Sequence, residues 1–376
     1  MRQNVAVFFG GKSCEHDVSV ITGLQVCGNI DEIKFNCIPV YITREGRWLT
    51  GDKLTDKKSY TDFTTGGTRG CYFEPGSSRL LTKGMVMGSS IVIDAAVVCT
   101  HGGGGENGSL QGLLNLSGVP YTSCNVLGSG ITMDKISMKS LFKSARIGSL
   151  PYHWFYSGEY EADTESVLSQ IETKLGYPVM VKPSNLGSSI GVSRCDNREE
   201  LVQGIEVAAR YDNRVLAEQA LTDFSEINIS CVGVEGQYEL SSCEEIRGFK
   251  HILSFGDKYV NKDKNIERIV PAQIDSTAEA KIRKTAEKAC RLCDCAGAVR
   301  VDFLINNTDG KIYINEINSI PGSLSYQLWK ASGVSFGRLL DKLIEIAVLK
   351  HRAEQELNYS YESAALFNFS DGFKTS

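Results

Sequence analysis

The segment NEINSIPGS, residues 315–323, follows the apolar stretch KIYI and closes on a Pro-Gly break. An apolar stretch that stops at a break of this kind is typical of a β-strand, and its alternation places Glu316 and Asn318 on one face. A second apolar run, VRVDFLI, has the same pattern and places Arg300 and Asp302 on one face. The two runs therefore predict neighbouring strands that carry a ledge of acidic and amide side chains.

The residue types on this ledge allow two interpretations. Two carboxylates and an amide oxygen are hard ligands of the kind that Mg²⁺ prefers, and Mg²⁺ in turn binds phosphates. The alternative is a structural salt bridge between Arg300 and one of the acids. Isolated carboxylates are costly to bury on apolar strands. The sequence therefore favours a magnesium site formed by Asp302, Glu316 and Asn318.

The composition is that of an ordinary globular protein. The chain has 376 residues, a hydrophobic content of 42% and a formal net charge of −5. This length predicts two or three domains, and the mixed charges argue against nucleic-acid binding. No apolar run approaches the ~20 residues of a membrane span, and the N-terminus lacks the features of a signal peptide. We therefore expect a cytoplasmic protein that binds neither nucleic acid nor membrane.

The twelve cysteines have irregular spacings. Cys290, Cys293 and Cys295 form a cluster that could hold a metal, but a structural zinc site usually needs a second Cys or His pair. Reduced, buried thiols in the cytosol are the favoured interpretation.

The order of the predicted elements indicates an α/β protein. A strand at 4–9, a Gly-Gly turn, a helix over 16–30 and further β-branched runs predict a parallel α/β sheet, with an irregular insertion over 44–90. Short strands such as YPVMVKPS and SSIGVSRC and a helix capped by Asn197 follow. The predicted units are listed by residue range: an N-terminal domain 1–130, a small central α+β domain 131–220, a C-terminal α+β domain 221–350 and a tail 351–376.

The first glycine-rich segment is FFGGKSCEHDVS. A phosphate-binding P-loop needs a glycine five residues before its final glycine, and Ala6 stands there. A strand–Gly-Gly–helix turn remains, and it places Glu15 near a helix N-terminus at the edge of the sheet where ligands of α/β proteins bind. Glu15 is thus either a ligand-binding residue or an acid that interacts with the helix dipole, and the sequence favours neither.

The second glycine-rich segment is HGGGGENGSLQG, residues 101–112. It satisfies G-x-G-x-x-G, but a dinucleotide site also needs an acidic residue about 20 positions later, and none ends a second strand there. Dense glycines still indicate a close approach of the backbone to another group. His101 is a candidate site residue, with a capping or packing role as the alternative.

The third glycine-rich segment is VMVKPSNLGSSIGV, residues 179–192. Successive backbone N–H groups and two serine hydroxyls can surround phosphate oxygens, with Lys182 as a fixed cation. An ordinary hairpin with a surface lysine is the alternative, and we favour the phosphate site.

Taken together, these segments resemble the D-alanine–D-alanine ligase family of the ATP-grasp fold. The resemblance covers about residues 1–350 in the family's order. It includes PYTSCNVLGSGITMDKISMK and the DKY of the loop 255–268 as well as the segments above. It implies a three-domain ATP-grasp fold and the ATP-dependent joining of two D-alanines, with two Mg²⁺ ions (or Mn²⁺), for peptidoglycan synthesis. It also implies a homodimer.

The resemblance assigns roles to particular residues. ATP would be bound by Lys135, Lys182, Ser189, Glu218, Glu226 and Lys258, and the metal ions by Asp302, Glu316 and Asn318. Arg300 and the backbone N–H of Gly322 would stabilise the oxyanion. Glu15 would hold the ammonium group of the first D-amino acid, in a hydrogen-bonded triad with Ser188 and Tyr259. His101 would lie near the first substrate, and Ser323 and Gln327 would lie near the second.

The chain departs from the family pattern mainly at the second substrate. PGSLSYQLW replaces the usual Pro-Gly-Met-Thr segment, Gln327 stands where a serine is usual, and Ala220 stands where an aromatic residue is common. D-Serine, or another acceptor used by an ATP-grasp ligase, is therefore the alternative to D-alanine. A catalytically inactive nucleotide sensor is disfavoured because Arg300 and the acids are present.

Overall fold

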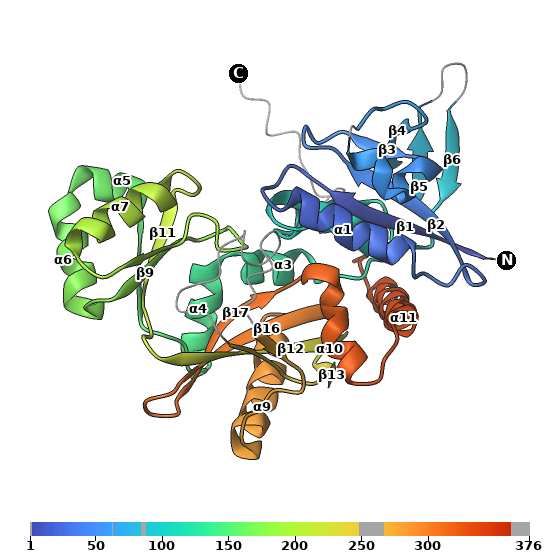
Figure 1. Cartoon of the computed structure of the whole chain (residues 1–376). Coiled ribbons are helices and arrows are strands. Elements are labelled where there is room, and N and C mark those ends of the chain that lie inside the picture. Colours follow the sequence, from blue (N-terminus) through green and yellow to red (C-terminus); the bar gives the residue numbers. More distant parts are fainter. Residues whose placement is uncertain (1, 62, 84–87, 248–266, 362–376) are drawn as a thin grey trace.

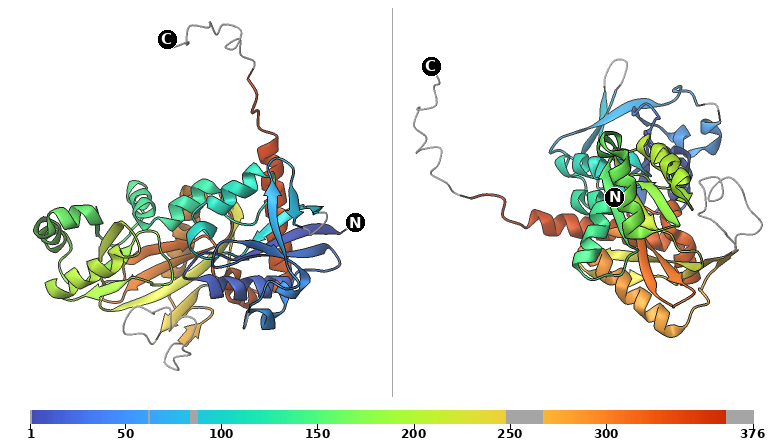
Figure 2. Two further views of the ribbon diagram at one scale, coloured as in Figure 1. Left: turned by 90° about the horizontal axis from the view of Figure 1, so that it is seen from above. Right: turned by 90° about the vertical axis from the view of Figure 1, so that its left-hand side faces the viewer.

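The computed structural model describes residues 2–61, 63–83, 88–247 and 267–361, and these form three units, each built on its own β-sheet (Figure 1). Figure 2 shows the N-terminal and central sheets at opposite ends of the molecule, with the third sheet between them. The α/β organisation expected from the sequence is confirmed.

The N-terminal sheet has the strand order β6-β5-β4-β3-β2-β1-β7. β1 (Gln3–Gly10) runs parallel to β2 (Phe35–Ile42) and to β7 (Ala95–Val98), as predicted. The irregular insertion predicted for 44–90 is wrong, because this stretch forms antiparallel strands that widen the sheet. Those strands are β3 (Trp48–Thr50), β4 (Arg69–Glu74), β5 (Arg79–Thr82) and β6 (Ser89–Val92), joined in part by the short helices η1 (Asp52–Thr55) and η2 (Lys57–Tyr60).

Helices from both ends of the chain cover this sheet. α1 (His16–Cys27) follows the Gly-Gly turn as predicted, and η3 (Gly103–Gly105) and α2 (Ser109–Leu116) follow β7. α11 (Phe336–Gln355) packs its Leu339, Leu340 and Leu343 into the same core, although these residues belong to the C-terminal range. The tail was predicted to begin at residue 351. That residue instead lies in α11, which continues to Gln355 and packs on the N-terminal sheet.

The central sheet has the order β10-β9-β11-β8 and is covered by three helices. The strands are β8 (Tyr152–Tyr156), β9 (Val179–Pro183), β10 (Ser193–Cys195) and β11 (Arg214–Gln219), and the helices are α5 (Ser157–Ala162), α6 (Thr164–Leu175) and α7 (Arg198–Ala209). Asn197 caps α7 by accepting a hydrogen bond from the Glu200 N–H, as predicted. The strand predicted for SSIGVSRC is too long, because Ser188 and Ser189 have φ of 52° and 58° and form a turn instead.

The third sheet has the order β15-β14-β12-β16-β17, with β13 paired to β12. Its long strands are β12 (Phe224–Val234), β16 (Gly297–Asn306) and β17 (Ile312–Asn318), and its short ones are β13 (Gln237–Leu240), β14 (Glu244–Arg247) and β15 (Glu267–Ile269). The accompanying helices are α3 (Val126–Met133), α4 (Lys135–Ser144), α9 (Ser276–Leu292), η4 (Gly322–Ser325) and α10 (Tyr326–Ala331).

The core of the third sheet includes residues from the range predicted for the central domain. Met138 and Phe142 of α4 pack with Ile227, Val301 and Phe303 of the sheet. Because an amphipathic helix is stabilised mainly by the core it packs against, α4 belongs physically to the third sheet. This packing brings Lys135, the first residue of α4, to Glu316 near the end of β17.

The structure bears on the expectations for the cysteines and for membrane spans. All twelve cysteines lie among them, and none forms a disulfide. Cys290, Cys293 and Cys295 are buried in the core of the third sheet. In the described ranges, no helix has both the length and the apolar character needed to cross a bilayer.

Candidate active site

Two adjoining cavities lie where the three units meet. The first, of about 300 Å³, is lined by residues from α1, the glycine loop after β7, β16, β17 and the turn after β17. The second, of about 110 Å³, lies between the central sheet and the third sheet. Lys135, Gly187, Ser188, Glu226 and Glu316 line both cavities, so the two form one continuous site.

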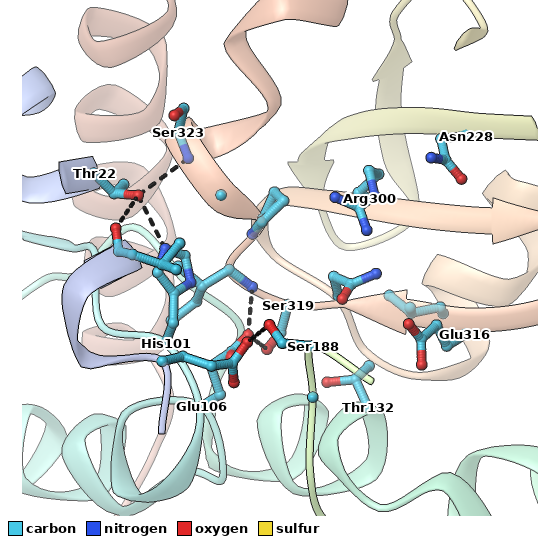
Figure 3. Close-up of a pocket in the computed structure, with 18 of the residues that line it drawn as sticks. Thr22, His101, Glu106, Thr132, Ser188, Asn228, Arg300, Glu316, Ser319 and Ser323 are labelled. Atoms are coloured by element: carbon cyan, nitrogen blue, oxygen red, sulfur yellow. Dashed lines mark hydrogen bonds between the residues drawn. The ribbon is translucent and has the colours of Figure 1, made fainter. Parts of the chain in front are cut away.

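The ledge predicted from the sequence lies between the two cavities. Arg300 pairs with Asn318 across β16 and β17, and Asp302 pairs with Glu316. Directly opposed residues on neighbouring strands have their side chains on the same face. The faces predicted from strand alternation are therefore confirmed, and the pairing puts the three proposed metal ligands together. Figure 3 shows Arg300 and Glu316 of this ledge.

The ledge contains the salt bridge that was one of the two interpretations, and the magnesium site stays a prediction. Arg300 makes a bidentate ion pair with Asp302, with Nε–Oδ1 and Nη2–Oδ2 distances of 2.6 and 2.7 Å. Asn318 Nδ2 donates to Asp302 Oδ2 at 2.9 Å, so the amide oxygen of Asn318 stays available. No cluster of three or more His, Cys, Asp or Glu side chains suited to a metal occurs in the described residues, but two carboxylates with an amide oxygen fit a hard cation.

Glu15 lies at the opposite wall of the first cavity. It occupies the N-cap position of α1 and is buried, and the Ser188 hydroxyl donates a hydrogen bond to its Oε1. Two glycines make room for the carboxylate: a Cβ on Gly102 or on Gly187 would lie 2.5 or 2.9 Å from Glu15 Oε2. The glycine loops thus bring the backbone close to an acid, and the Glu15–Ser188 part of the predicted triad is formed.

Glu106 is a site residue that the sequence reasoning missed. Its Oε2 accepts a hydrogen bond from Gly102 N at 2.7 Å, and its Oε1 accepts from Ile320 N at 3.1 Å and from Ser319 Oγ at 3.3 Å. Burial and then the nearby charge of Glu15 raise the pKa of Glu106 to about 8, against the opposing effect of these hydrogen bonds. The signal that could have revealed it is its place inside a predicted site segment, since Glu106 is the acid of HGGGGENG.

The raised pKa predicts that an ammonium ligand will displace a proton. At pH 7, below its pKa, Glu106 is mostly protonated, and a cation in this cavity favours the ionised form. We expect D-alanine binding at pH 7 to release a proton, approaching about one per site. Titration calorimetry in two buffers of different ionisation enthalpy, with Mg²⁺ and a non-hydrolysable ATP analogue present, measures this release. Glu106→Gln should abolish the release, and equal release from both proteins would contradict the prediction.

His101 is buried behind the same wall. Its Nε2 lies 3.0 Å from Thr22 Oγ1. Burial lowers the pKa of His101 to about 4, although a hydrogen bond to the backbone of Ile320 opposes this. The imidazole is therefore neutral near pH 7. His101 is buried as its packing alternative predicts and also lines the first cavity, and its place near the first substrate stays a prediction.

The second cavity contains the residues predicted to bind the nucleotide. Lys135 donates from Nζ to Leu186 O at 2.7 Å and lies 3.7 Å from Glu316 Oε2. Lys182 and the serine turn lie across from it, and Ser189, Glu226 and Ala220 also line this cavity. Lys258 and Tyr259 lie outside the described residues.

Glu218 was expected to contact the nucleotide, but in the structure its carboxylate faces two lysines. Lys139 Nζ lies 2.7 Å from Oε2 and Lys182 Nζ lies 3.6 Å from Oε1. Although burial opposes it, the two ammonium groups lower the pKa of Glu218, which keeps the carboxylate ionised. Lys139, 1% exposed, was missed because a lysine in a helix is usually exposed. Glu218 therefore fixes Lys182 at the cavity, and its own contact with a nucleotide stays a prediction.

The turn after β17 forms the remaining wall of the first cavity. Gly322, Ser323 and Gln327 all line it. Ser323, Leu324 and Ser325 have consecutive positive φ values of 50°, 51° and 54°. L-residues rarely adopt this conformation in succession, so the surrounding contacts must hold the turn in place.

Comparison with known proteins places the chain in a family. The sequence models described as "D-ala D-ala ligase N-terminus" and "D-ala D-ala ligase C-terminus" match residues 4–124 and 141–345. The chain belongs to the D-alanine–D-alanine ligase family. The family resemblance inferred from the sequence is thus confirmed, and with it an ATP-dependent ligase that uses a divalent metal ion.

Individual relatives agree with this assignment. A D-alanine–D-alanine ligase from Thermosipho melanesiensis is 37% identical over 350 residues, covering 92% of this chain and 93% of the relative. The solved structure of the D-alanine–D-alanine ligase from Coxiella burnetii matches with a TM-score of 0.81 and 25% identity, covering 94% and 96% of the two chains. A D-Ala:D-Ser ligase, VanG, from Enterococcus faecalis matches with a TM-score of 0.80 and 30% identity, covering 92% and 100%. The three-domain ATP-grasp architecture is confirmed.

Proposed function

We propose that this protein joins two D-alanines into D-alanyl-D-alanine at the expense of ATP, through an acyl phosphate, and so supplies a precursor of peptidoglycan. The observation that carries the proposal is the continuity of the two cavities. The acid ledge with Arg300 lies between a cavity lined by two lysines and a cavity lined by Glu15. A site of this kind can pass a phosphoryl group from one ligand to a carboxylate held beside it.

The residues of the chain have distinct tasks in this reaction. Glu15 binds the ammonium group of the first D-alanine and turns its carboxylate toward the ledge. A carboxylate oxygen of that substrate bonds to the γ-phosphorus of ATP, and the bond to the bridging oxygen of ADP breaks. In this proposal Lys135 and Lys182 hold the phosphates, and Ser189 and Glu226, which line the same cavity, contact the rest of the nucleotide.

The second step forms the peptide bond. The amine of the second D-alanine bonds to the acyl carbon and loses a proton, and inorganic phosphate leaves. Arg300 and the N–H of Gly322 line the cavity where negative charge develops on the carbonyl oxygen. Ser323 and Gln327 lie where the carboxylate of the second substrate would be bound.

The ledge residues fit the metal that such a reaction needs. We propose that Asp302, Glu316 and Asn318 hold two Mg²⁺ ions, for which Mn²⁺ can substitute. The ions supply positive charge that neutralises the phosphate oxygens during phosphoryl transfer. We also propose that the protein is a cytoplasmic homodimer. Lys258 and Tyr259, which lie outside the described residues, would complete the site.

D-Serine is the second candidate for the acceptor. It is favoured by the match to a D-Ala:D-Ser ligase and by the unusual segment PGSLSYQLW, which carries Ser323 and Gln327 beside the acceptor position. Both hypotheses keep D-alanine as the donor of the carboxylate.

A screen of ADP release distinguishes these hypotheses. D-Alanine with Mg²⁺-ATP is paired in turn with D-alanine, D-serine, D-lactate and L-alanine. We expect release with D-alanine alone and little stimulation by L-alanine or D-lactate. Release that requires D-serine would favour the second candidate, and release only with substrates other than D-amino acids would contradict both.

A further inference from the structure

The strained turn after β17 is tied to the N-terminal unit by a short chain of hydrogen bonds. Ser323 N donates to Thr22 Oγ1 at 3.1 Å, and Thr22 Oγ1 lies 3.0 Å from His101 Nε2 (Figure 3). Thr22 is fully buried in the middle of α1, the helix that begins at Glu15. One hydroxyl therefore connects the helix that begins beside the first substrate to the turn that borders the second.

His101 links Thr22 to the turn a second time. Its ring bonds to the backbone of Ile320, and its Nε2 lies 3.0 Å from Thr22 Oγ1. The Thr22 hydroxyl donates to Val18 O at 3.1 Å and accepts from Ser323 N at 3.1 Å. The chain of bonds runs from Ile320 through His101 and Thr22 back to Ser323.

Both ends of the turn are thus fixed by residues of the N-terminal unit. Glu106 holds Ile320 N, His101 contacts the backbone of Ile320, and Thr22 holds Ser323 N. Gly322, proposed to stabilise the oxyanion, lies between these anchored residues. Because three residues from Ser323 onward have positive φ, the turn would relax to another conformation if an anchor were lost.

We propose that Thr22 is a positioning residue for the acceptor half of the site: it holds Ser323 so that the second substrate is bound in register with the acyl phosphate. This inference rests on the proposed function. It assigns no contact between Thr22 and the reacting atoms. It predicts that the loss of the hydroxyl affects use of the second amino acid and spares activation of the first.

The test compares ligation with a reaction that needs no bound acceptor. Hydroxylamine at high concentration traps an acyl phosphate as the hydroxamate without recognition by the turn. In Thr22→Val, which keeps the shape of the side chain, and in Thr22→Ala, which does not, Ser323 N loses its acceptor. We expect the KM for the second D-alanine to rise about tenfold and kcat for ligation to fall. The rate of D-alanine hydroxamate formation should stay within about twofold of the wild type.

Two further variants complete the design. Thr22→Ser keeps the hydroxyl and should restore ligation. Thr82→Val removes another buried hydroxyl of the N-terminal unit, one bonded to Ser89 Oγ at 2.7 Å, and should leave both reactions unchanged. Thermal unfolding of each variant shows that it is folded.

The proposal is overturned if Thr22→Val and Thr22→Ala lower ligation and hydroxamate formation equally, if neither reaction changes, or if Thr22→Ser behaves like valine. Failure of the proposed function is seen in the wild type, which would then form no D-alanyl-D-alanine. The two failures are therefore distinguishable.

Discussion

Replacing Arg300 with alanine will lower the turnover of ligation by about 100- to 1,000-fold, the loss that follows removal of an oxyanion donor. The guanidinium lines the first cavity and is fixed there by its bidentate pair with Asp302. A donor that is already oriented stabilises developing charge without reorganisation at the moment of reaction. Steady-state ADP release at saturating D-alanine measures the effect.

The same substitution also removes the partner of Asp302, so a structural control is needed. Arg247 offers one, because it makes a bidentate pair with Glu245 two residues away on β14, at 2.6 and 2.9 Å. Arg247 lies on the same sheet but does not line either cavity. Arg247→Ala should lose a similar ion pair and keep near-normal turnover. If Arg300→Ala turned over at close to the wild-type rate, Arg300 would have no part in stabilising the oxyanion.

Local patterns in the sequence were enough to place the ledge. Alternation with a period of two predicts which side chains share a face, and it correctly grouped Arg300 with Asp302 and Glu316 with Asn318. The register between the two strands was not predictable in this way. It depends on the pairing of β16 with β17, and that pairing puts Asp302 directly opposite Glu316.

The residues that the sequence reasoning missed act over long distances in the chain. Glu106 bonds to Ile320, 214 residues away, and Thr22 bonds to Ser323, 301 residues away. Local periodicity carries no information on such contacts, because they depend on how separate units pack. Lys139 was missed for a related reason. Its helix packs on the third sheet, and its ammonium group is paired with Glu218 of the central sheet, so its burial depends on contacts distant in the sequence.

Short antiparallel strands were the main error in the fold. β4 buries Cys71 and Phe73 and exposes Tyr72 and Glu74, which is the pattern of a half-buried strand. Strands of three to six residues separated by glycine and lysine give few repeats of this pattern, and the stretch was interpreted as irregular. For α11 the helix itself was predictable from its period. The sheet that it covers was not, because that sheet is formed by residues from the other end of the chain.

Glu316→Gln is expected to raise the Mg²⁺ concentration required for half-maximal ADP release about tenfold or more and to lower kcat by about 100-fold. The substitution preserves the size of the side chain and removes one of the two carboxylate charges on the ledge. Glu316 lines both cavities, and in the proposed function the phosphates and the carboxylate of the first substrate meet between them. The measurement is ADP release against Mg²⁺ at fixed ATP and D-alanine.

Glu239 provides the matched control for this variant, because it lies on β13 of the same sheet and its carboxylate pairs with Lys342 at the surface. Glu239→Gln removes an equal charge and should leave the Mg²⁺ dependence unchanged. A general weakening of Mg²⁺ binding by loss of negative charge would move both variants, whereas a metal ligand at the ledge moves Glu316→Gln alone. Unchanged Mg²⁺ dependence in Glu316→Gln would mean that Glu316 is not a metal ligand and that the ledge serves mainly the ion pair of Asp302 with Arg300.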